Sequence, residues 1–120
     1  MARTLSVKVQ AGLAGTYKRF GGPISSSGST FYTVPADGTG VVEAISIGNP
    51  SGSVVSVTCD ILDASDNVIS NVVTNAEIAA GTGLDLVQNK LTIETGEKLR
   101  CTSSSNNNLH ATISVFEIIS

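Results

Sequence analysis

The stretch Val54-Val-Ser-Val-Thr-Cys-Asp-Ile-Leu62 carries the pattern that decides the fold. Its apolar positions alternate with polar ones: Val55, Val57, Cys59 and Ile61 against Ser56, Thr58 and Asp60. Successive side chains of a β-strand point to opposite faces, so a segment of this kind buries one face and leaves the other to solvent. The stretch therefore predicts a half-buried strand.

The same period of two continues on both sides of this stretch. Further strands are expected at residues 29–34, 41–47, 68–73, 84–87, 91–94, 98–103 and about 110–118. Segments rich in Gly, Pro, Asn and Asp separate them, as at residues 35–40 and 63–67, and these residue types favour tight turns. About eight short antiparallel strands without a helical period predict an all-β fold, a β-sandwich or jelly roll.

Charge is distributed unevenly along the chain. Of its seven basic residues, four lie in the first twenty positions, which contain no acid: Arg3, Lys8, Lys18 and Arg19. The rest of the chain carries all ten acidic residues against three basic ones. A stretch of Gly and Ser with one Pro follows the basic end and is typical of a flexible joint. The expected organisation is a basic N-terminal arm at 1–20, a Gly/Ser hinge at 21–29 and a β-sandwich body at 30–120.

The arm has features of a docking segment. Leu5, Val7 and Val9 alternate with polar residues, which suits a strand added to the sheet edge of a neighbouring molecule. Arg3, Lys8, Lys18 and Arg19 would then face acidic patches and guide orientation. The alternative is that residues 4–9 form the first strand of the chain's own sandwich.

The last expected strand is apolar on both faces. Ile113 and Val115 occupy one face, while Phe116 and Ile118 occupy the other. Such a strand is either central to a sandwich or buried in a contact between subunits. Phe116 and Ile118 are therefore candidates for a subunit interface.

No motif indicates catalysis or a bound cofactor. His110 is the single histidine and is expected to be exposed at a strand end, and with Cys59 and Cys101 it makes no zinc site at the usual spacings. Both cysteines fall on the apolar phase of their strands and are expected to be buried free thiols. A disulfide between them would need adjacent strands and an oxidising compartment.

The densest group of acids is Asp60, Asp63 and Asp66. Asp63 and Asp66 belong to an expected hairpin turn, where Asp is favoured because its side chain bonds the local backbone. Calcium binding is the alternative, with Ser65 and Asn67 as further oxygen ligands. We expect the protein to be metal-free and not an enzyme.

Composition restricts the partners. No run of apolar residues is long enough to span a membrane, and the first residues lack the apolar block of a secretory signal, so synthesis in a cytoplasm is expected. The acidic body argues against nucleic acid as the main partner. Only 14% of the residues are charged, which favours a surface partly covered by neighbours. The aromatic content of 4%, with no Trp, argues against a carbohydrate-binding module.

Several phrases resemble small structural proteins of tailed bacteriophages. They are Thr30-Phe-Tyr-Thr-Val-Pro-Ala-Asp-Gly-Thr39, Ile45-Ser-Ile-Gly-Asn-Pro-Ser-Gly52, Ile78-Ala-Ala-Gly-Thr-Gly-Leu-Asp-Leu86, Leu91-Thr-Ile-Glu-Thr-Gly-Glu-Lys-Leu-Arg-Cys101 and Ala111-Thr-Ile-Ser-Val-Phe-Glu-Ile118. The resemblance covers about residues 29–118 and leaves the basic arm out.

This resemblance implies a virion protein made in the host cytoplasm. Similar modules serve as capsid decoration (cement) proteins, which bind the outer shell and bridge capsid subunits, and others belong to tails, necks or fibre bases. The partners implied are the major capsid protein or other virion proteins. A homo-oligomer is expected, with a trimer first, because such modules commonly occupy three-fold positions.

Overall fold

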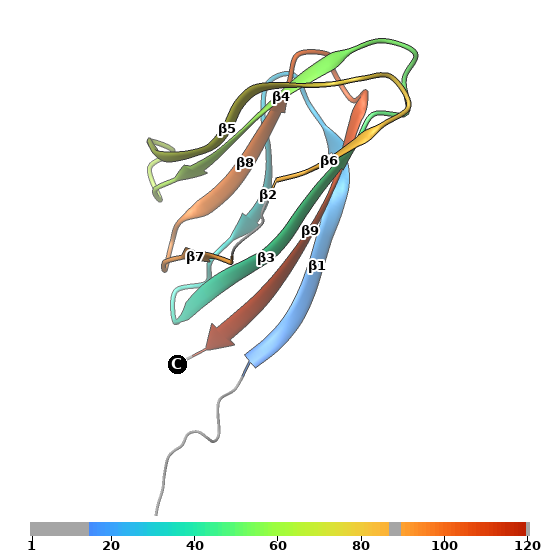
Figure 1. Cartoon of the computed structure of the whole chain (residues 1–120). Helices are drawn as coiled ribbons and strands as arrows, with labels where there is room; N and C mark the ends of the chain where they lie inside the picture. Colours follow the sequence, from blue (N-terminus) through green and yellow to red (C-terminus); the bar gives the residue numbers. More distant parts are fainter. Residues whose placement is uncertain (1–14, 87–89, 120) are drawn as a thin grey trace, which may run out of the picture.

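A computed structural model describes residues 15–86 and 90–119, and these residues fold into two antiparallel sheets (Figure 1). The first sheet has the order β1 (Gly15–Ile24), β9 (Leu109–Ile119), β3 (Gly38–Gly48) and β6 (Gly83–Asp85), and β7 (Leu91–Ile93) also pairs with β3. The second has the order β2 (Ser29–Thr33), β8 (Lys98–Ser103), β4 (Val55–Leu62) and β5 (Val68–Ile78). The predicted all-β sandwich is confirmed, and no described residue is helical.

The core lies between the two sheets, where the alternation of the sequence places it. In β4, Val55, Val57 and Cys59 are buried, and Ser56 and Thr58 on the other face are half-buried. In β9, Leu109, Ala111, Ile113 and Val115 point inward. Because both sheets contribute branched apolar residues at every second position, the two inner faces pack as in other β-sandwiches.

Strand β9 is central. It pairs with β1 on one side, over ten residues, and with β3 on the other. A strand with two apolar faces is either central to a sandwich or buried in a subunit contact. β9 is central, and its inner face packs into the core. The outer-face residues Phe116 and Ile118 are half-buried.

The boundary expected between arm and body is wrong in one respect. Residues 15–24 form β1, so Lys18, Arg19 and the Gly21-Gly22-Pro23 part of the expected hinge belong to the sandwich. Gly21 lets this segment lie close to β9, because a side-chain Cβ at position 21 would be only 2.8 Å from the carbonyl oxygen of Ala111. Ile24, at the end of β1, is fully buried. The turn joining β1 to β2 spans residues 25–28. Residues 1–14 lie outside the described part of the chain.

Candidate functional site

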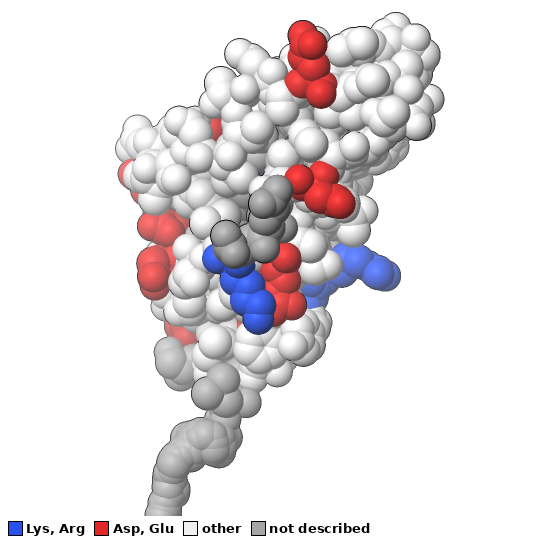
Figure 2. Space-filling model, in the orientation of Figure 1, with Lys and Arg blue, Asp and Glu red and all other residues white. Residues whose placement is uncertain are grey.

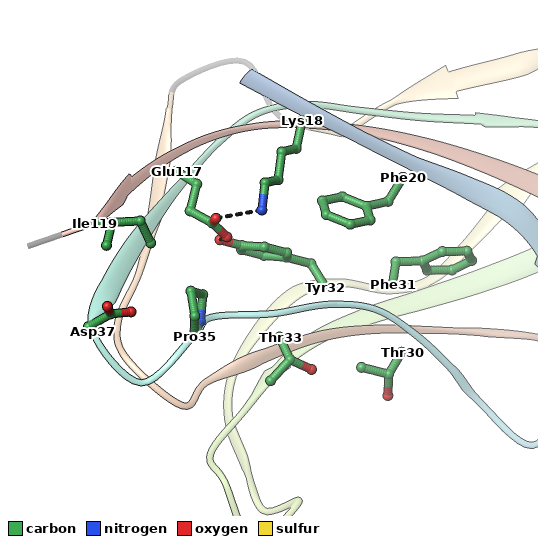
Figure 3. A pocket seen from close by; sticks show the side chains of 10 residues that line it. All are labelled: Lys18, Phe20, Thr30, Phe31, Tyr32, Thr33, Pro35, Asp37, Glu117 and Ile119. Atoms are coloured by element: carbon green, nitrogen blue, oxygen red, sulfur yellow. Dashed lines mark hydrogen bonds and ion pairs between the residues drawn. The ribbon is translucent and has the colours of Figure 1, made fainter. Parts of the chain in front are cut away.

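One side of the sandwich opens into a groove between the edge strands β1 and β2 (Figure 3). Within the described residues, β1 pairs only with β9 and β2 only with β8, so each has one unpaired edge. The cavity measures about 570 Å³. We call it the lateral groove, and it is lined by Lys18, Phe20, Thr30, Phe31, Tyr32, Thr33, Pro35, Asp37, Glu117 and Ile119.

A buried carboxylate with two partners lies in the lateral groove. Lys18 Nζ is 2.7 Å from Glu117 Oε1, and the Tyr32 hydroxyl donates a hydrogen bond of 2.7 Å to Glu117 Oε2 (Figure 3). Glu117 is 5% exposed and Tyr32 is 3% exposed. A buried charge is tolerated only when it is paired and hydrogen-bonded, and both conditions are met here.

These contacts shift the pKa values of both acidic groups. The Lys18 ammonium and the Tyr32 hydroxyl, in that order, hold the pKa of Glu117 below its ordinary value. Burial, followed by the bond to the Glu117 carboxylate, raises the pKa of Tyr32. At neutral pH the carboxylate is therefore charged and the phenol keeps its proton.

The backbone shapes the groove around this group. Gly40 in β3 leaves room for the Tyr32 ring, since a Cβ at position 40 would lie 2.5 Å from the ring carbon Cε2. The β2–β8 register shifts between Thr30 and Tyr32, so Phe31 is the extra residue of a bulge. Bulges of edge strands redirect side chains, and Phe31 lies on the groove side, near Phe20 (Figure 3). The groove thus combines an aromatic lining with two strand edges that are left open in the described part of the chain.

We expect the Glu117 pair to give the protein an acid-sensitive component of stability. The pKa of Glu117 is lower in the folded chain than the roughly 4.3 of a free glutamate. The stabilisation is therefore present above about pH 4.3 and is lost as pH falls through the folded pKa. The melting temperature of Glu117→Gln should be below that of the unmodified protein at pH 7, and the difference should shrink below about pH 4.

Glu77→Gln, at an exposed position of β5, removes one carboxylate away from the groove and is the control. Thermal melts between pH 7 and pH 2.5 make the comparison. A Glu117→Gln difference that stays constant over that range would show that the pair does not act as described.

An exposed aromatic pair lies on the outer face of the first sheet. Tyr17 is 73% exposed, and its ring stacks obliquely on Phe116 with the centroids 4.7 Å apart. Gly15 lies beneath the same ring, since a Cβ there would be 2.0 Å from Phe116 Cζ. Ile118, two residues further along β9, lies on the same face, directly opposite Gly15 in the register. We call Tyr17, Phe116 and Ile118 the aromatic patch.

The structure separates the residues predicted for docking. Lys18 forms an ion pair with Glu117 and keeps 45% of its side chain exposed, and Arg19 next to it is also exposed. Phe116 and Ile118 are brought together in the aromatic patch. The remaining predicted arm residues lie outside the described part of the chain: Arg3, Leu5, Val7, Lys8 and Val9. Tyr17 was not among the predicted site residues, because its segment was assigned to the arm. Its position between the polar Thr16 and Lys18 was the available signal for a strand with Tyr17 on one face.

The other expected sites have local structural roles. Asp63 accepts hydrogen bonds from the backbone nitrogens of Asn67 and Ser65, at 3.0 and 2.8 Å, and these bonds hold the turn between β4 and β5 and lower the pKa of Asp63. His110 is exposed near the start of β9, as predicted. Among residues 15–86 and 90–119, no group of three or more His, Cys, Asp and Glu side chains is arranged to hold a metal ion. The same residues contain no helix that could cross a membrane.

Charged side chains are sparse on the face shown in Figure 2. The acidic ones are scattered over that face, the basic ones lie in its lower half, and most of the surface is uncharged. Specific attachment through this face would therefore depend on shape and apolar contact more than on a strong electrostatic field.

The fold is shared with a protein of very different sequence. No protein-family model and no curated protein matches the chain. A solved structure described as Bacillus endospore appendages that form a novel family of disulfide-linked pili is 7% identical, with a TM-score of 0.56 over 89% of this chain and 88% of that one. A chain of the T13 particle of infectious bursal disease virus is 12% identical, with a TM-score of 0.48. That match covers 88% of this chain and 31% of the viral chain.

Proposed function

We propose that the protein is a non-enzymatic structural subunit of a tailed-bacteriophage virion, and specifically a capsid decoration protein that binds the outer shell and bridges capsid subunits. The strand and turn phrases between residues 29 and 118 support the bacteriophage assignment, because they resemble proteins of that kind. The sandwich fold shared with a pilus subunit is compatible with a structural role.

One observation carries the proposal. The aromatic patch and the point where residues 1–14 join the sandwich are at the same end of the molecule, because Gly15 lies against Phe116. Figure 1 shows the start of β1 and the C-terminal end of β9 side by side there. The basic segment without acids is therefore joined to the sandwich next to an apolar surface, an arrangement that suits attachment.

The attachment would combine a strand and a patch. Leu5, Val7 and Val9 alternate as in a strand that adds to the sheet edge of a neighbour, where main-chain hydrogen bonds supply affinity. Arg3 and Lys8 would steer this segment towards acidic surfaces, since exposed ion pairs contribute only about 0.2–1 kcal/mol each. The lateral groove of a second copy could receive such a strand, because it has an aromatic lining and two edges that no described strand pairs with. Copies joined in this way would form a homo-oligomer, with a trimer as the first expectation.

A tail, neck or fibre-base adaptor is the second candidate. The same edges of β1 and β2, which are unpaired within residues 15–86 and 90–119, would also allow copies to join into a ring. The two candidates differ in the component bound, the capsid shell or the tail, and in the number of copies in each particle.

The attachment surface is tested by Tyr17→Ser. We expect this variant to keep its melting temperature within a few degrees, since Tyr17 is largely exposed, and to co-sediment with purified particles of the encoding phage at least tenfold less than the unmodified protein. Val54→Ser removes another exposed apolar side chain, 60% exposed, before β4 at the other end of the sandwich, and should bind normally. Equal binding of the unmodified protein and both variants would show that the aromatic patch is not part of the attachment surface.

A further inference from the structure

Two cysteines face each other on neighbouring central strands of the second sheet. Cys59 in β4 and Cys101 in β8 are direct partners in the register, and both are fully buried as free thiols. The two strands are bordered by the edge strands β5 and β2. A disulfide between the two cysteines requires adjacent strands, and the structure meets that condition.

The pair occupies the class of cross-strand position where side chains are closest. In an antiparallel ladder, hydrogen-bonded and non-hydrogen-bonded pairs alternate. Ser56 and Ser104 are the residues next to the register pair Val57–Ser103. Ser104 N donates a hydrogen bond of 2.9 Å to Ser56 O, so Ser56–Ser104 is a hydrogen-bonded pair. Ser103 N instead donates to Ser25 O, away from β4. Cys59 lies three residues after Ser56 in β4, and the two classes of pair alternate with every residue. Cys59–Cys101 is therefore a non-hydrogen-bonded pair.

This class of pair has the dimensions of a disulfide. Its Cα atoms lie about 4.5 Å apart, and disulfides span Cα separations of about 4.4–6.8 Å. The neighbouring Cys101 thiol, followed by burial, raises the pKa of Cys59. A bond can therefore form with little movement of either strand.

We propose that Cys59 and Cys101 form an intramolecular disulfide that ties β4 to β8, and that the folded sandwich favours this bond over the two free thiols when a small disulfide is the oxidant. This inference goes beyond the proposed function and does not depend on it.

The reaction is a double thiol–disulfide exchange with oxidised glutathione. One cysteine loses its proton, attacks a glutathione sulfur and releases one reduced glutathione, which leaves a mixed disulfide on the protein. The second cysteine loses its proton, attacks the protein sulfur of that mixed disulfide and releases the second reduced glutathione. Two thiols are oxidised to one disulfide, and one glutathione disulfide is reduced to two thiols.

Burial determines how fast the folded chain reacts. The thiolate is the nucleophile, and a buried thiol with a raised pKa forms little of it. The folded protein should therefore react through local opening of the sheet or while it folds. The second step should then be fast, because the resolving thiol lies directly opposite.

The test is the equilibrium of the full-length chain with oxidised and reduced glutathione. The chain is refolded from the reduced, urea-unfolded state, and the oxidised fraction is measured by intact mass and peptide mapping after acid quenching. In buffer, the equilibrium constant for the Cys59–Cys101 bond should exceed the value in unfolding concentrations of urea by at least tenfold. The melting temperature of the oxidised form should then exceed that of the reduced form, by about 10 °C.

Single variants control the assignment. Cys59→Ala and Cys101→Ala each remove one thiol and should show no two-dalton loss of mass. The proposal is overturned if the chain in buffer stays reduced at equilibrium, if it stops at mixed disulfides, or if the bond is favoured more in urea than in buffer. An oxidised form that melts below the reduced form would overturn it equally, because the fold would then disfavour the bond.

Discussion

Deleting residues 1–14 should leave a folded sandwich, whereas deleting residues 1–24 should unfold it. The longer deletion removes β1, which pairs with β9 over ten residues. It takes away the fully buried Ile24 and the partly buried Phe20, and it leaves Glu117 without Lys18. Burial of each large apolar side chain contributes about 1.5–3 kcal/mol, so the loss is comparable with a typical domain stability of about 5–15 kcal/mol.

Circular dichroism and thermal melts of the two truncated proteins make this comparison. The shorter deletion should shift the melting temperature by no more than a few degrees and should abolish attachment to particles. A shorter truncation that fails to fold would show that residues 1–14 belong to the chain's own sandwich, for example with residues 4–9 as a further strand. A longer truncation that melts normally would contradict the role given to β1.

Replacing Ile113 by Ala should destabilise the protein far more than the same replacement at Ile118. Both residues lie in β9, but Ile113 is fully buried between the sheets while Ile118 is half-buried on the outer face. Cavities left by large-to-small changes in a core cost about 2–5 kcal/mol. We expect about 3 kcal/mol at Ile113, seen as a fall of 10 °C or more in melting temperature, and about 1 kcal/mol at Ile118.

The pair is matched because strand, residue type and loss of β-propensity are the same, so only burial differs. Urea unfolding measures both free energies. Equal losses at the two positions would mean that the faces of β9 are assigned incorrectly. The Ile118→Ala protein also serves the attachment assay, since it should remain folded while part of the aromatic patch is removed.

Sequence alone predicts the body of the fold because alternation marks one buried face in each strand. In β4, the polar Ser56 and Thr58 separate Val55, Val57 and Cys59, and no other structure satisfies that period. Most of the other expected strands differ from the observed ones by a few residues at their ends. β5 extends to Ile78 because bulges in its pairing with β4 let the strand continue past the end of its apolar run.

β1 was missed for a physical reason. Gly21, Gly22 and Pro23 are typical of a linker, but an edge strand tolerates them. The close approach of Gly21 to Ala111 depends on pairing with a strand about ninety residues away. Local composition carries no signal for such a contact.

The lateral groove could not be predicted for a related reason. Tyr32 and Glu117 are 85 residues apart in the sequence, and their hydrogen bond arises from how the two sheets face each other. In the sequence, Glu117 is a single polar residue between the apolar Phe116 and Ile118. Its alternation with Val115 and Ile113 was the available signal that it points inward.

Counting the copies of this chain in each purified particle tests the central proposal most directly. Absolute quantification by mass spectrometry, relative to the major capsid protein and to a tail-tube protein, gives the number. A decoration protein of the shell predicts hundreds of copies, in a fixed ratio to the major capsid protein and retained on capsids without tails. A few copies to a few dozen, lost with the tails, would contradict the shell assignment and favour the tail adaptor, and absence of the chain from particles would contradict a virion role altogether.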